Sequence, residues 1–139
     1  MKQFSIFSAA CALALTALPT LAEDDKKAQI CAEAEERFVE FFGYPSAEEE
    51  GVTVVTMYKY NFCPAEITVP VGTTVRWVNV DKRTSHSVLS PDAGMPESDR
   101  AFPEEFVEFT FLEPGAAETL CGPHWERQKM IGMVTVETE

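Results

Sequence analysis

The spacing of apolar residues changes near residue 51, and this change constrains the fold more than any other feature of the chain. Before it, residues 24–42 repeat apolar side chains at the period of an α-helix. After it, β-branched and aromatic residues fall in short segments, several of them alternating, with turn residues between them. The expected strands are residues 52–60, 66–69, 73–79, 85–89, 106–111, 117–121 and 133–137. Seven or eight short strands predict an all-β domain over residues 52–139, a Greek-key β-sandwich, preceded by a helix and linker over 23–51.

The expected helix carries an aromatic stripe formed by Phe38, Phe41 and Phe42. Gly43 and Pro45 follow it and predict its end. A stripe of this size needs an apolar partner surface. It could cover one face of the sandwich or mediate a dimer, and we expect a monomer.

The first residues resemble a secretory signal peptide. Lys2 precedes an apolar stretch over residues 4–18, and small residues lead to Ala22. We therefore expect residues 1–22 to be removed on export to the periplasm. The apolar stretch is too short to span a membrane, and no later segment is long enough.

The net charge of the chain favours some classes of partner and disfavours others. All 23 Asp and Glu residues, and 10 of the 11 Lys and Arg residues, follow residue 22, so the exported part carries a net charge of −13. Such a surface repels nucleic acid and anionic membranes and steers basic proteins toward it. The same charge could also serve solubility alone.

The cysteines divide into three groups. Cys11 lies in the expected signal peptide, and Cys121 lies in a loop near the C-terminus. Cys31 and Cys63 remain as a pair in an oxidising compartment, which predicts a disulfide. The bond would contribute roughly 3–4 kcal/mol in the chain-entropy model. The alternative is two buried free thiols.

Cys121, His124 and Met130 place a thiol, an imidazole and a thioether within ten residues. The only other histidine, His86, ends a strand-like segment upstream. One Cys, two His and a weak Met form the ligand set of a blue-copper electron-transfer site. Zinc is the nearest chemical alternative, but it usually takes four firm ligands or three and a water.

Three segments together resemble the cupredoxins, the plastocyanin, pseudoazurin and amicyanin group. Residues 62–81 resemble the family's second and third strands, which lead to a histidine at the position of His86. Residues 121–124 match its Cys-x-Pro-His motif, and residues 130–136 match its Met-x-Gly-x-Val-x-Val closing strand. The resemblance implies a cupredoxin fold with one type 1 copper per chain, held by His86, Cys121 and His124 with Met130 as the axial ligand.

The axial position has two candidates. Five residues separate His124 from Met130, whereas four do so in plastocyanin and pseudoazurin. Met133 falls within the closing strand, on the face opposite Val134 and Val136. Met130 precedes that strand, which favours it as the axial ligand, with Met133 as the alternative.

In this family the C-terminal ligand histidine looks out through an apolar patch where electrons are thought to enter and leave. The resemblance therefore implies that His124 is an electron gate, with Pro123 and Trp125 lining the patch. Trp125 could instead be a core residue.

We expect a periplasmic carrier of single electrons that catalyses no bond-making, rather than an enzyme. Its partner would be a basic redox protein such as a c-type cytochrome or a periplasmic oxidoreductase. Two other functions stay open. A copper carrier or scavenger would tolerate a solvent-open site, and a small copper enzyme would keep an open coordination position.

Overall fold

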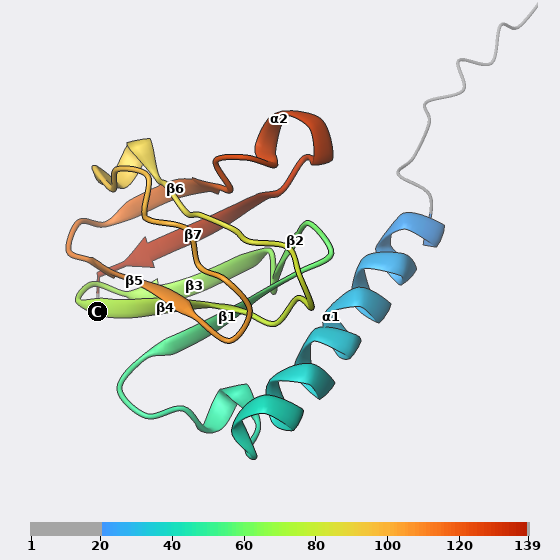
Figure 1. The fold of residues 1–139 in the computed structure, drawn as a ribbon. Coiled ribbons are helices and arrows are strands. Elements are labelled where there is room, and N and C mark those ends of the chain that lie inside the picture. The colour runs from blue at the N-terminus through green and yellow to red at the C-terminus, as the bar shows by residue number, and fades with distance from the viewer. Residues whose placement is uncertain (1–20, 139) are drawn as a thin grey trace, which may run out of the picture.

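The computed structural model describes residues 21–138 as a two-layer β-sandwich with one long helix along its side (Figure 1). The helix α1 spans Leu21–Phe42 and begins three residues before the expected start. The predicted signal peptide lies outside the described residues except for Leu21 and Ala22, the first residues of α1. None of the helices in the described part of the chain has the length and apolar character needed to cross a bilayer.

The seven strands form two sheets. One sheet has the order β2-β1-β4-β5, and the other has the order β3-β7-β6. Each sheet contains one parallel pair, β1 with β4 and β3 with β7, so strands distant in sequence lie side by side. This arrangement confirms the expected sandwich. The strands are β1 (Thr53–Tyr58), β2 (Asn61–Cys63), β3 (Glu66–Pro70), β4 (Thr73–Asn79), β5 (Phe106–Phe111), β6 (Gly115–Leu120) and β7 (Ile131–Glu137).

Six of the seven expected strands match an observed strand to within two residues at each end, and β2 was not expected. The strand expected over 52–60 stops at Tyr58, because Lys59 and Tyr60 adopt left-handed φ values of 46° and 61° and turn the chain into β2. The strand expected over 85–89 is wrong. There the chain makes isolated bridges, from His86 to Ala101 and then from Leu89 to Leu120 in β6. It changes partner within three residues, so no continuous ladder forms.

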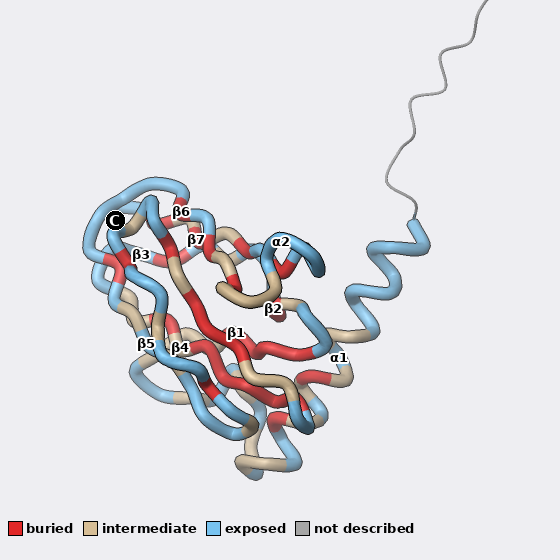
Figure 2. The backbone as a smooth tube through the Cα atoms, turned by 45° about the horizontal axis from the view of Figure 1, so that its top comes forward, coloured by how far each residue is buried: buried red, intermediate tan, exposed pale blue. Residues whose placement is uncertain are grey.

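β1 and β4 are covered on both faces and supply two separate apolar cores. Trp77 of β4 faces the core between the sheets, while its neighbour Val78 faces α1. Side chains alternate along a strand, so one strand serves both cores. Figure 2 shows that β1 and β4 are largely buried, and the last four residues of β1 and the last three of β4 are buried without a break.

The second half of α1 packs on the outer face of β1 and β2, which is one of the two roles expected for its aromatic stripe. Ala34 and Phe38 are buried there, and the rings of Phe38 and Phe42 have centroids 4.7 Å apart. The predicted disulfide between Cys31 and Cys63 is present and ties the helix to β2. The helix therefore covers one face of the sandwich.

Candidate metal centre

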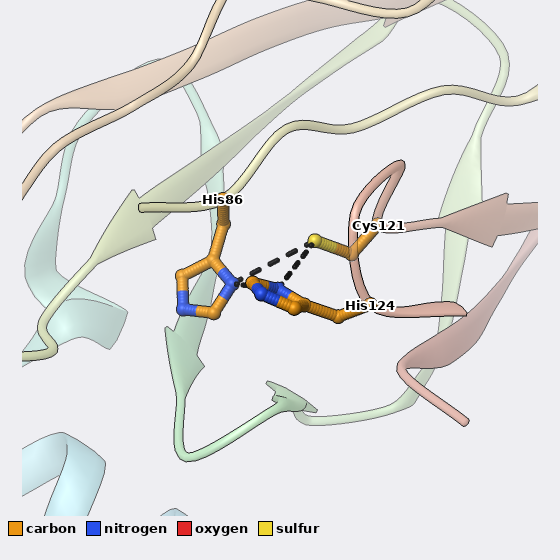
Figure 3. Close-up of side chains that lie close together, drawn as sticks. All are labelled: His86, Cys121 and His124. Atoms are coloured by element: carbon orange, nitrogen blue, oxygen red, sulfur yellow. Dashed lines mark hydrogen bonds between the residues drawn. The ribbon is translucent and has the colours of Figure 1, made fainter. Parts of the chain in front are cut away.

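The structure brings three of the predicted donors together at one end of the sandwich (Figure 3). The Sγ atom of Cys121 lies 3.4 Å from Nδ1 of His124 and 3.6 Å from Nδ1 of His86. The two Nδ1 atoms are 3.2 Å apart. Donor atoms of all three residues lie within 4.8 Å of one another, close enough to coordinate a single metal ion.

A tight turn after β6 places two of these donors on the same side. The backbone N–H groups of His124 and Trp125 both donate to the carbonyl of Cys121, at 3.0 and 2.8 Å. Cys121 in turn donates its N–H to the carbonyl of Met130 at 3.2 Å, and Met130 donates to His124 at 3.3 Å. The loop is thus closed by its own backbone, which holds Cys121, His124 and Met130 in a fixed relation.

Gly122 lets the cysteine loop pack closely on the histidine loop. A Cβ atom at this position would lie 1.9 Å from Oε1 of Glu97 and 2.7 Å from Oγ of Ser87. In the space this leaves, Gly122 donates its N–H to Oγ of Ser87 at 3.1 Å, and Ser87 donates to Glu97 at 2.7 Å. Because Ser87 follows His86, these bonds fix the two donor loops relative to each other.

Asp81 orients the imidazole of His86. Its Oδ2 lies 2.5 Å from Nε2 of His86, which leaves Nδ1 pointing toward Cys121. Both side chains are buried, and His86 is fully so. The other oxygen of Asp81 accepts the backbone N–H of Lys59 at 3.3 Å. A carboxylate that holds the second nitrogen of a metal-binding histidine sets its ring orientation and tautomer.

Asn79 supports this arrangement from the end of β4. Its side-chain amide donates to the carbonyls of Thr84 and Ala101, at 2.8 and 2.9 Å. Its Oδ1 accepts the backbone N–H of Asp81 at 2.9 Å. These bonds shape the connection between Asp81 and His86. Sequence patterns do not reveal this role, because a buried Asn or Asp after a strand resembles an ordinary turn residue.

Met130 is fully buried at the end of the cysteine loop, whereas Met133 lies half-buried within β7. The residues between His124 and Met130 form the short helix α2 (Trp125–Gln128) and one left-handed residue, Lys129, with φ of 56°. This helical turn accommodates the longer loop and returns the chain to the interior at Met130. The assignment of Met130 as the axial ligand stays a prediction.

Burial favours the neutral form of two donors. It raises the pKa of the Cys121 thiol. Burial has the largest effect in lowering the pKa of His124, and the nearby His86 and Arg100 lower it further. The imidazole is thereby kept ready to donate a lone pair, while a metal ion must displace the thiol proton on binding.

His124 alone of the four predicted ligands reaches the surface. His86, Cys121 and Met130 are completely buried, whereas His124 is only partly covered. The ring of Tyr60 lies edge-on to it, with centroids 4.8 Å apart. Trp125 is 37% exposed, so it is a surface residue rather than a member of the core. The sequence does not reveal the contact between Tyr60 and His124, because this contact depends on the turn between β1 and β2.

The donor chemistry fits copper. A soft thiolate and two imidazoles suit both common oxidation states of this metal, and a buried thioether lies next in the same loop. The three firm donors come from rigid, hydrogen-bonded loops rather than from flexible chain ends. The residues present therefore match a copper site in type and arrangement.

Comparisons with known proteins agree with this chemistry. Residues 49–137 match the model of the copper-binding proteins of the plastocyanin/azurin family. Halocyanin of Natronomonas pharaonis is 42% identical over 95 residues, a match that covers 64% of this chain and 58% of halocyanin. The chain thus spans less than two thirds of that relative's length.

Solved structures of amicyanin variants share the fold. A reduced Cu(I) form of one variant superposes with a TM-score of 0.56 and 29% identity, over 68% of this chain and 90% of amicyanin. A Cu(I) form of a second variant gives a TM-score of 0.57 with the same identity and coverage. The chain belongs to the plastocyanin/azurin family of copper-binding proteins, the cupredoxins, and its cofactor is one copper ion.

Proposed function

We propose that this protein is a periplasmic carrier of single electrons. Its copper would be a type 1 centre held by His86, Cys121 and His124, with Met130 as the axial ligand. The observation that carries the proposal is the convergence of the three firm donors, whose ligand atoms lie within 4.8 Å of one another. Electron transfer by copper is the general function of this family, which supports the proposal.

The protein's contribution is a rigid and largely dry set of donors. Bound copper supplies a reversible one-electron couple. Asp81 holds the ring of His86, and the backbone bonds of the loop hold Cys121 and Met130. Donors fixed in this way need little rearrangement when the charge of the site changes. A site that is preorganised for both charge states suits a carrier better than a scavenger.

The proposed route for electrons is the exposed edge of His124, with Pro123 and Trp125 beside it. Both neighbours are at least partly exposed, and the other three ligands have no surface of their own. A partner would therefore contact the protein at this edge. The net charge, −12 for the whole chain and −13 for the residues after Ala22, favours long-range approach by a basic redox protein, such as a c-type cytochrome or a periplasmic oxidoreductase.

Electrochemistry of the copper-loaded protein tests the proposal. A carrier should give a reversible one-electron wave and should keep its copper through repeated cycles in the presence of a competing chelator. Loss of copper to the chelator at each reduction would indicate a metal carrier instead. Catalytic current in the presence of oxygen would indicate an enzyme with an open coordination position. Either of these results would contradict the proposal.

A further inference from the structure

Four of the six lysines of the chain line a single groove, although the chain as a whole is strongly acidic. The groove has a volume of about 480 Å³. It lies between the exposed first turns of α1, the turn between β1 and β2, and the end of α2. The lysines are Lys26, Lys27, Lys59 and Lys129.

The start of α1 separates its charges by face. Lys26, Lys27 and Ile30 line the groove, as residues three and four apart on a helix should when they share one face. Asp24 and Asp25 point to other sides of the helix and do not line the groove. The helix therefore presents cations and an apolar side chain to the groove and keeps these two carboxylates outside it.

The lysines outnumber the carboxylates that face them. Glu23 is the acidic member of the lining, and Glu33 pairs with Lys59 at 2.6 Å on the neighbouring surface. Among the described residues, Lys26, Lys27 and Lys129 make no ion pair. Asn61 and Gln128 complete the polar lining with neutral amides. The groove thus keeps a positive charge.

The groove reaches the proposed electron gate. Tyr60 lines it and packs edge-on against the ring of His124. Lys129 also lines the groove, and it directly precedes Met130 in the sequence. A chain segment lying in the groove would contact Tyr60 and rest beside His124, so recognition and electron transfer would share one surface.

We propose that this groove binds an acidic segment of the redox partner. Charge complementarity identifies the occupant, because three unpaired lysines line the groove together with Ile30 and Tyr60. The net charge of the whole chain governs approach from a distance, whereas the lysines govern the contact itself. The redox role of the partner rests on the proposed function, but the binding of an acidic segment does not.

An NMR titration with hexa-aspartate at low ionic strength tests the groove. We expect the peptide to shift the amide signals of Lys26, Lys27, Tyr60 and Lys129 in the isotope-labelled protein loaded with Cu(I). The double variant Lys26→Gln and Lys27→Gln should bind the peptide roughly three- to tenfold more weakly, because it removes two exposed charges from the site. These side chains lie on an exposed helix face, so the fold should be unaffected.

The matched control is the double variant Lys82→Gln and Arg83→Gln, which makes the same charge change at exposed positions outside the groove. It should retain affinity. Equal losses in both variants would show that only net charge matters and would overturn the proposal. Shifts that change on dilution without peptide would assign the groove to a second copy, which would also overturn it. The same titration without copper gives the groove result even if the electron-transfer proposal fails.

Discussion

The two apolar cores of this molecule differ in what they hold in place. The core between the sheets includes Cys121 and Met130 and extends to the loops that carry the metal donors. The core under α1 consists of apolar and aromatic residues, among them Phe38, with Cys63 buried and its disulfide partner Cys31 packed against it. The comparison indicates that the sandwich alone builds the copper site. The helix adds a second, separable layer and shapes the surface beside the site.

The two cores nevertheless share β1 and β4. Trp77 and Val78 are neighbours in β4 but belong to different cores. The same strand leads to Asp81, which orients His86. Disturbance of the helix could therefore reach the metal site through this strand. Variants of either region therefore measure how far the two are independent.

The largest expected effect on stability comes from Phe38→Ala. Phe38 is 1% exposed, and its removal should cost about 3–5 kcal/mol of the free energy of unfolding. The visible spectrum of the copper-loaded protein should not change. The control Val39→Ala, at an exposed position of the same helix, should cost far less. A changed spectrum in the folded Phe38→Ala variant would show that the helix supports the metal site after all.

Replacement of both Cys31 and Cys63 by Ser should have the next largest effect. The disulfide closes a sequence separation of 32 residues, and its loss should cost about 2–4 kcal/mol. Chemical denaturation of the oxidised wild type and the variant would measure it. Copper binding should survive, because neither cysteine lies in the metal cluster. Loss of copper binding from a folded variant would argue against separable regions.

Asp81→Asn changes the surroundings of the metal site without touching the helix. The amide oxygen can still accept a bond from His86, but the buried negative charge is lost. Without that charge Cu(I) is favoured over Cu(II), so the reduction potential should rise. A tenfold change in the ratio of the affinities for Cu(I) and Cu(II) corresponds to about 59 mV in the reduction potential. Asp99→Asn removes the same charge at an exposed position and should leave the potential nearly unchanged. Equal shifts in both variants would show that the buried charge of Asp81 has no particular effect on the copper.

The smallest effect should come from Glu33→Gln. The hydrogen bond from Lys59 lowers the pKa of Glu33, but the Lys59 side chain is 50% exposed and that of Glu33 35% exposed. Surface ion pairs of this kind contribute little to stability. Thermal unfolding should show no resolvable change at neutral pH or in acid, where the carboxylate becomes protonated. A clear loss of stability would show that the Glu33–Lys59 ion pair holds the middle of α1 to the turn between β1 and β2 more firmly than its exposure implies.

The sequence predicted the parts of this molecule that local patterns determine. The strands over 73–79 and 106–111 agree with β4 and β5, because alternating β-branched and aromatic residues mark half-buried strands. The Cys31–Cys63 disulfide followed from counting the cysteines of a chain expected to be exported. The convergence of His86, Cys121 and His124 followed from their chemistry and from the family motif.

Features that depend on tertiary contacts were not predictable. The turn at Lys59 and Tyr60 lies inside a segment with strand-like residues, and only the pairing of β1 with β2 reveals it. Asp81 contacts His86 because Asn79 folds the intervening loop, which no spacing rule encodes. The lysine groove joins residues from three distant segments, so the net charge of the chain does not reveal it.

The most direct test of the central claim is a visible absorption titration of the metal-free protein with Cu(II), beside the Cys121→Ser variant. The account predicts an intense blue band that saturates at one copper per chain in the wild type. The variant should show no such band, because the colour requires the thiolate of Cys121. A pale wild-type spectrum, or a variant that stays blue, would contradict the assignment of a type 1 copper site to these residues.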